Sequence, residues 1–188
     1  MRCWGERRKA TLSTDAPIVL DADFVSSFAW VDRMDILENL YSKRMVILEE
    51  VMEELNRVPH LAARVRLCVE KGHITIETML AGSPEALQLA RFHESGRYGA
   101  GEASCMAYLV YRGGILASNN LADVKAFCAV HKMPLLTTPD VLLQSYEDGR
   151  LGVKEADAIW SGMLARRRKL PTSSFTEYLA TLKRGGGH

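Results

Sequence analysis

The sequence is poor in residues that bind transition metals or form disulfides. It has four cysteines, Cys3, Cys68, Cys105 and Cys128, and no two of them form a close pair. Cys105 and Cys128 lie in apolar helical patterns, where a buried thiol behaves as a small hydrophobic side chain. The five histidines are far apart and have no spacing typical of a metal site. We therefore expect a protein of a reducing compartment, the cytoplasm, without a zinc site.

Long hydrophobic runs are also absent. A charged residue interrupts every apolar stretch before it reaches the roughly 18 residues that a membrane helix needs. The first 17 residues carry Arg2, Glu6, Arg7, Arg8 and Lys9 but no apolar segment of the kind found in signal peptides. We therefore expect neither a signal peptide nor a membrane partner.

Neither sign of charge is in excess. The 24 Lys and Arg residues against 23 Asp and Glu residues leave a formal charge of +1, which gives no global attraction to nucleic acid. Any contact with a polyanion must therefore come from a local patch. The clearest patch is the run Arg166-Arg167-Arg168-Lys169, for which a solvated helix end is the ordinary structural explanation.

What the chain has is an alternation of short apolar runs with longer helical patterns, over 188 residues of which 47% are hydrophobic. The expected strands are residues 18–20, 45–48, 73–77, 115–117 and 135–137. The expected helices are residues 35–41, 49–57, 61–71, 84–93, 101–111, 121–131, 139–148 and 154–168. This alternation predicts an α/β fold, a three-layer α/β/α sandwich around a five-stranded, mainly parallel sheet.

The ends of the chain differ in composition from its centre. We expect a flexible extension over residues 1–16, the α/β domain over 17–151, a C-terminal helical extension over 152–184 and a disordered tail over 185–188. The reason is that the two termini are small and polar and have little to pack.

Polar side chains follow the expected strands or open the next helices. In an open α/β sheet, ligands bind at the carboxyl ends of the strands. The candidate residues at these ends are Asp21, Asp23, Glu54, Glu102, Ser118, Asn119, Asn120 and Asp123. Carboxylates gathered at one edge repel one another unless they are protonated or neutralised by a cation. Oxygen ligands without His or Cys suit Mg²⁺ or Mn²⁺, which can activate water and stabilise charge on a phosphate.

Each carboxylate also has an ordinary explanation. Glu54 is equally typical of an exposed helical side chain. Glu102 and Asp123 lie in first helical turns, where the helix dipole favours a negative charge. Asp21 is harder to explain in this way, because it follows an apolar strand that we place inside the sheet. The order of the four along the chain carries more weight than any single position.

Four segments resemble the PIN-domain family. Ile18-Val19-Leu20-Asp21 is similar to the family's first strand and first acid, and Val51-Met52-Glu53-Glu54-Leu55 to its Val-x-x-Glu-Leu helix. Gly99-Ala100-Gly101-Glu102 is similar to its Gly-x-Gly-Glu helix start, and residues 115–123 with 133–138 to its last strands and the acid between them. The resemblance covers residues 17–151, and it implies a PIN-like domain there with the strand order 3-2-1-4-5.

PIN domains are metal-dependent nucleases, and many are ribonuclease toxins of toxin–antitoxin pairs. The resemblance implies that Asp21, Glu54, Glu102 and Asp123 are catalytic, and that Asp21, Glu102 and Asp123 bind Mg²⁺ or Mn²⁺. We expect the four carboxylates to converge within roughly 10 Å on one pocket. The implied activity is hydrolysis of single-stranded RNA, and the implied partners are RNA, an antitoxin protein and a second copy of the chain in a homodimer.

The chain departs from the family pattern after the fourth strand. Many members have Asp directly after it, where this chain has Asn119 and Asn120. Either Asp123 supplies the fourth acid one helical turn later, or the site is weakened. Asp23, Ser118, Asn119 and Asn120 are auxiliary candidates, and Arg166, Arg167, Arg168 and Lys169 are candidates for contacts with the RNA backbone.

Two alternatives remain open. Asp21-Ala22-Asp23-Phe24-Val25 also resembles the Asp-x-Asp-x-Val start of haloacid-dehalogenase-like phosphatases, with Asp21 as nucleophile and Asp23 as general acid/base. That family needs an acid pair after a later strand, where this chain has only Asp140, and it gives Glu54 and Glu102 no role. The second alternative is a PIN-like scaffold that binds RNA or protein without cleavage, which the asparagines after the fourth strand keep open.

Overall fold

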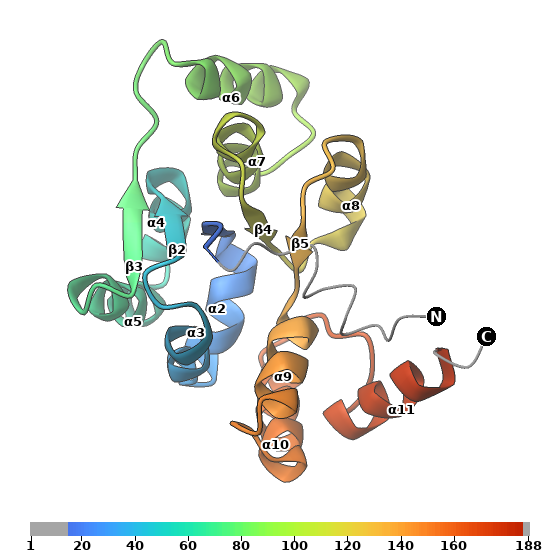
Figure 1. Cartoon of the computed structure of the whole chain (residues 1–188). Coiled ribbons are helices and arrows are strands. Elements are labelled where there is room, and N and C mark those ends of the chain that lie inside the picture. Colours follow the sequence, from blue (N-terminus) through green and yellow to red (C-terminus); the bar gives the residue numbers. More distant parts are fainter. Residues whose placement is uncertain (1–14, 186–188) are drawn as a thin grey trace.

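The computed structural model of the chain describes residues 15–185. The predicted flexible extension therefore lies almost entirely outside the described residues, as do residues 186–188 of the predicted tail. A single five-stranded sheet is formed by β1 (Ile18–Leu20), β2 (Met45–Leu48), β3 (Ile74–Glu77), β4 (Ile115–Ala117) and β5 (Leu135–Leu136). All of its strand pairs are parallel, and the order is β3-β2-β1-β4-β5 (Figure 1).

The helices flank this sheet. Their bounds are α2 (Ala22–Trp30), α3 (Met34–Tyr41), α4 (Glu49–Asn56), α5 (Pro59–Glu70), α6 (Pro84–Ser95), α7 (Ala100–Arg112), α8 (Leu121–Val130), α9 (Thr138–Glu147), α10 (Val153–Ala165) and α11 (Phe175–Gly185). The predicted α/β sandwich and the predicted strand order are both confirmed. No helix of residues 15–185 combines the length and the apolar character needed to cross a membrane.

The central position of β1 follows from its composition. Ile18, Val19 and Leu20 are each at most 1% exposed, as expected for a parallel strand covered on both faces. Val19 is paired with Val46 on one side and with Leu116 on the other. Because β1 and β4 are adjacent and parallel, the residues that follow them, Asp21 and Ser118, meet at the same edge of the sheet.

Two helices were missing from the sequence prediction. Helix α2 begins directly after Asp21 and buries Phe24, Val25 and Phe28 in the core. Aromatic and β-branched residues have modest helix propensity, and burial of this apolar face overrides it. Helix α11 follows the predicted last helix, and its Phe175 and Tyr178 are buried.

Two predicted boundaries differ from the structure. Pro59 was expected to end a helix, but it occupies the first turn of α5, where its missing N–H costs nothing. The last predicted helix, residues 154–168, ends at Ala165, and Arg167 takes a left-handed conformation with φ of 59°. By contrast, α6 begins as predicted, because Ser83 caps it and Pro84 occupies its first turn.

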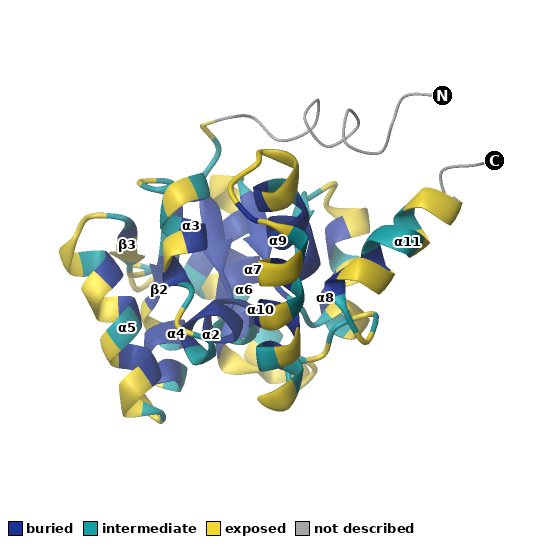
Figure 2. Ribbon diagram, turned by 90° about the horizontal axis from the view of Figure 1, so that it is seen from below, coloured by how far each residue is buried: buried dark blue, intermediate teal, exposed yellow. Residues whose placement is uncertain are grey.

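The C-terminal helices pack onto the same core as the sheet. Trp160 of α10 is fully buried, and its indole N–H donates to the carbonyl oxygen of Thr172 at 2.9 Å. Its ring lies 5.9 Å from that of Phe175 and 5.4 Å from that of Tyr178. Figure 2 shows the exposed outer faces of α10 and α11 around this buried centre. The aromatic contacts fix the segment that joins α10 to α11, residues 166–174, beside the carboxyl edge of the sheet.

Candidate active site at the carboxyl edge of the sheet

A polar cleft of about 540 Å³ lies beyond the carboxyl ends of β1 and β4. Its walls come from five parts of the chain that are far apart in sequence. The lining residues are Asp21, Asp23, Glu54, Gly99, Glu102, Asn119, Asn120, Asp123, Arg167, Arg168 and Lys169. The four predicted catalytic carboxylates therefore line one cleft, which is larger than a pocket for a single ion.

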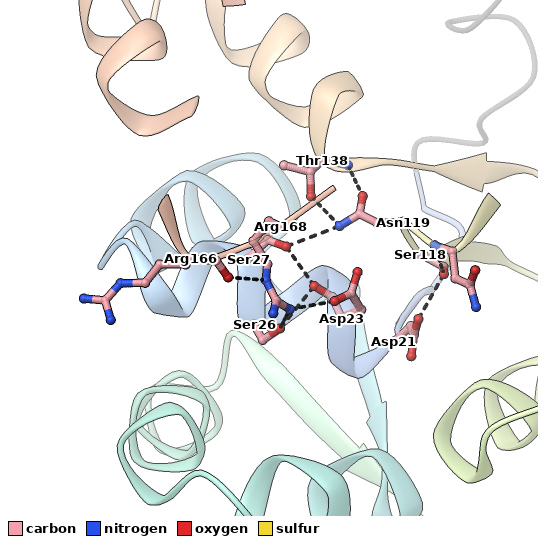
Figure 3. A network of polar contacts seen from close by, with 10 residues as sticks. Asp21, Asp23, Ser26, Ser27, Ser118, Asn119, Thr138, Arg166 and Arg168 are labelled. Carbon is pink, nitrogen blue, oxygen red and sulfur yellow. Dashed lines mark hydrogen bonds and ion pairs between the residues drawn. The ribbon is translucent and has the colours of Figure 1, made fainter. Parts of the chain in front are cut away.

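Asp21 lies at the floor of this cleft. Its backbone N–H donates to the carbonyl oxygen of Ala117, so the bonding between β1 and β4 continues to this residue. The hydroxyl of Ser118 donates to Oδ2 of Asp21 at 2.9 Å (Figure 3). The pKa of Asp21 is raised to about 6, mainly by burial and less by repulsion from the carboxylates of Asp23 and Glu54, while the hydrogen bond from Ser118 acts in the opposite direction.

Glu54 is held by the start of α7. Its Oε1 accepts a hydrogen bond from the backbone N–H of Gly101 at 2.8 Å. A Cβ atom at residue 101 would lie 3.1 Å from Cδ of Glu54, so a larger residue there would crowd the Glu54 carboxylate. The first turn of a helix has free N–H groups and a partial positive charge, which favour a carboxylate. The Gly-x-Gly-Glu motif thus positions two acids, Glu54 through Gly101 and Glu102 directly.

Glu102 and Asp123 face the cleft from α7 and α8 and are linked by one amide. The side-chain NH₂ of Asn120 donates to Glu102 Oε1 at 3.1 Å and to Asp123 Oδ2 at 2.6 Å. Burial, followed by repulsion from Asp21 and Asp123, raises the pKa of Glu102 to about 7. Asn120 is therefore a neutral link between two carboxylates that would otherwise repel each other.

The opposite wall of the cleft is basic and comes from the segment that joins α10 to α11. Arg167, Arg168 and Lys169 all line the cleft. The Arg168 guanidinium donates to Asp23 Oδ1 at 2.6 Å and to the hydroxyl of Ser26 at 3.4 Å (Figure 3). Arg166 points elsewhere, because its guanidinium carbon lies 5.0 Å from the ring centre of Trp30, outside the cleft.

The side-chain amide of Asn119 contacts α2 and the start of α9 beside the cleft. Its amide nitrogen donates to Thr138 Oγ1 at 2.9 Å and to the Ser27 hydroxyl at 3.3 Å, while its oxygen accepts from the backbone N–H of Thr138 at 2.9 Å. The side chain thereby ties the end of β4 to the start of α9 and to α2. An aspartate at this position could not donate hydrogen bonds to the two hydroxyls or to any other acceptor, so this arrangement is specific to the amide.

Sequence reasoning missed the partners that fix these residues. Ser26, Ser27 and Thr138 were not candidates, and neither was Gly99, which lines the cleft. The two serines belong to α2, a helix absent from the prediction, so their direction could not be inferred. The glycine spacing before Glu102 was the usable signal for Gly99 and Gly101.

The donor set of the cleft fits a hard divalent cation in type and charge. Four carboxylates, two of them with raised pKa values, offer only oxygen ligands, and a cation would offset their repulsion. Among residues 15–185, no group of three or more His, Cys, Asp or Glu side chains has the geometry to hold a metal ion as they stand. Asp21, Glu102 and Asp123 would therefore have to move from these positions to hold a cation together.

Two comparisons with known proteins were made, and neither identifies a relative of this chain. Neither a scan against protein-family models nor a search of curated proteins finds a match for this chain. The PIN resemblance consequently rests on the four motifs alone and remains a prediction.

Proposed function

We propose that the protein is a metal-dependent endoribonuclease whose active site is the acidic cleft. One observation carries the proposal: four carboxylates from separate elements, Asp21, Glu54, Glu102 and Asp123, line one cleft whose other wall is basic. Carboxylates that hold a cation beside arginines that bind phosphate are the parts that phosphodiester hydrolysis requires. The PIN resemblance favours RNA as substrate and extends the proposal to a toxin with an antitoxin partner.

Each group has a distinct part in this mechanism. Asp21, Glu102 and Asp123 would hold Mg²⁺ or Mn²⁺, which supplies an activated water and stabilises charge on the phosphate when bound. Glu54 fixes the start of α7 and thus the direction of Glu102. Arg167, Arg168 and Lys169 would bind the phosphates of the strand. Water oxygen bonds to phosphorus as the bond to the 3′ oxygen breaks, and that oxygen takes a proton, leaving 5′-phosphate and 3′-hydroxyl ends.

The phosphatase alternative is less well supported by the contacts. Its general acid would be Asp23, but this carboxylate is paired with Arg168. The lone acid after the fifth strand, Asp140, accepts from the backbone N–H of Thr137 at 3.0 Å and forms a capping box at the start of α9. Asp140 does not line the cleft. The acid that follows the fifth strand therefore takes no part in this cleft.

The experiment is a comparison of substrates with Mg²⁺ or Mn²⁺. We expect cleavage of single-stranded RNA labelled at either end, with products that carry 5′-phosphate, and no hydrolysis of p-nitrophenyl phosphate. Hydrolysis of the phosphomonoester without RNA cleavage would favour the phosphatase. Binding of RNA without metal-dependent cleavage would favour the scaffold.

A further inference from the structure

A second pocket opens from the proposed active site. It has a volume of about 410 Å³ and shares Asn119, Asn120 and Lys169 with the acidic cleft. The three shared lining residues place the two cavities next to each other. A ligand bound in the cleft can therefore extend into this second space without leaving the surface of the protein.

The chemistry of this pocket differs sharply from that of the cleft. Among residues 15–185, no carboxylate lines it, and its walls are mostly aliphatic or aromatic, with Leu121, Pro139, Leu170, Pro171 and Tyr178 around the space. The one charged lining residue in this described part of the chain, Lys169, also lines the cleft. For an anion the pocket offers one positive charge, that of Lys169. For a flat neutral ring it offers mainly apolar surface.

Leu121 adds exposed apolar surface to the pocket. It is the first residue of α8 and directly follows Asn120, yet it is a large apolar side chain that remains 46% exposed. The opposite side is supplied by Leu170 and Pro171, in the segment that also carries Arg168 to the acidic cleft. The segment joining α10 to α11 thus forms walls of both cavities.

We propose that this second pocket binds an unpaired nucleobase of the nucleotide next to the phosphate held in the acidic cleft. The inference rests on the proposed function and specifies its substrate. A nucleobase is neutral, has two apolar faces and is joined to a phosphate by one sugar, which matches an apolar pocket that shares Lys169 with the basic wall of the cleft. A base paired in a duplex cannot enter, so the pocket selects single strands.

The test measures binding without cleavage. Asp21→Asn protein with Mg²⁺ is titrated with adenosine 5′-monophosphate, uridine 5′-monophosphate and ribose 5-phosphate, with affinity read by ligand-observed NMR. Because contacts with a base face are worth a sizeable part of nucleotide affinity, at least one nucleotide should bind roughly tenfold more tightly than ribose 5-phosphate. Equal affinity for all three would overturn the proposal.

Two substitutions test whether the preference for nucleotides over ribose 5-phosphate arises in this pocket. Leu121→Glu places a charge in the pocket and Ala122→Phe fills it, and both residues are exposed, so neither change disturbs the core. Each should bring the nucleotide affinity to within about twofold of that for ribose 5-phosphate. Val130→Glu, on the same helix at a residue that is 78% exposed and lines neither cavity, is the matched control. A preference for nucleotides that survives both pocket variants would place the base elsewhere and contradict the proposal.

Failure of the two proposals can be told apart. Wild-type protein is tested for RNA cleavage in parallel with the binding measurements on Asp21→Asn. Nucleotide preference without wild-type cleavage would support the base pocket and contradict the nuclease. Cleavage without nucleotide preference would support the nuclease and contradict the base pocket.

Discussion

Glu54 Oε1 accepts a hydrogen bond from the backbone N–H of Gly101, and the missing side chain of Gly101 is what allows this approach. The pair joins α4, which follows β2, to the start of α7, which precedes β4. One carboxylate thereby sets the position of the helix turn that carries the next carboxylate, Glu102. One contact between α4 and α7 therefore positions both Glu54 and Glu102.

Gly101→Ala tests that relationship. The new methyl group would press on the Glu54 carboxylate at about 3.1 Å, so the carboxylate must move and the hydrogen bond lengthens. We expect RNA cleavage to fall by roughly tenfold to a hundredfold, because small misplacements of active-site groups are costly. Stability should change by less than about 1 kcal/mol, since the helix preference of alanine offsets the crowding.

The control for this substitution is Gly152→Ala, at a glycine whose added Cβ would meet nothing within 4 Å. Cleavage should be unchanged there. Full activity in Gly101→Ala would show that Glu54 does not need its contact with α7.

Asn120→Asp tests the amide link between Glu102 and Asp123. The substitution removes the two donated hydrogen bonds and adds a third negative charge to the pair. In the presence of a chelator, the free energy of unfolding at pH 7.5 should fall by about 1–3 kcal/mol, and excess Mg²⁺ should restore part of it. Urea denaturation measures both values. Asn39→Asp, at an exposed residue, should have almost no effect, and an equal loss in both variants would rule out the link.

The raised pKa values of Asp21 and Glu102 predict how the metal-free protein responds to pH. Their folded-state pKa values, about 6 and about 7, lie above the ordinary values of 3.8 and 4.5. Between about pH 4 and pH 7 the folded state therefore binds more protons than the unfolded state. These two groups cost no stability below about pH 4, and their unfavourable contribution grows as pH rises through 6 and 7.

The expected loss of stability in chelator between pH 4.5 and pH 8 is about 2–4 kcal/mol from these two residues. Glu102→Gln should remove about half of it, which a series of urea denaturation curves would show. Glu53→Gln, an exposed carboxylate of α4, is the matched control. A pH profile of Glu102→Gln identical to that of wild type would contradict the burial and repulsion that we describe.

Arg166 and Arg168 belong to one basic run of the sequence, but their side chains have different surroundings in the structure. Arg168 lines the cleft and is paired with Asp23, whereas Arg166 lies over Trp30. We expect Arg168→Gln to weaken binding of single-stranded RNA and to reduce the slope of log affinity against log salt by roughly 0.7–1. Arg166→Gln should leave both nearly unchanged. Fluorescence anisotropy at several salt concentrations measures the two effects, and equal losses in the two variants would contradict this placement.

The fold could be predicted because its signals are local. Short apolar runs ended by acids, with helical patterns between them, indicate parallel strands, and Ser83 with Pro84 marks the start of α6. Helix α2 escaped prediction because its stability comes from burial of Phe24 and Phe28 rather than from propensity. Because α2 was not predicted, the direction of the Ser26 and Ser27 side chains could not be inferred either.

The site was predictable only in part. Asp21, Glu102 and Asp123 could be named because each follows a strand or lies in the first turn of a helix, and the parallel sheet brings such positions to one edge. Glu54 lies later in α4, and the PIN resemblance gave it a role. Arg168 and Asp23 are paired although they lie 145 positions apart in the sequence. The pairing also depends on where α10 ends, which is three residues before Arg168. No local pattern predicts such a contact. The stripe of Phe175, Tyr178, Leu179 and Leu182 in α11 was a usable signal that the prediction left out.

The most direct test of the nuclease proposal compares wild type with Asp21→Asn on one end-labelled single-stranded RNA. The asparagine keeps the shape of the side chain and its contact with Ser118, but it removes the charge that would hold the cation. Wild type should cleave with Mg²⁺ or Mn²⁺, lose activity in EDTA and regain it when the ion is restored. Asp21→Asn should remain folded and show at most about a thousandth of that activity under all three conditions. Equal cleavage by the two proteins, or wild-type cleavage that persists in EDTA, would contradict the assignment of the acidic cleft as a metal-dependent nuclease site.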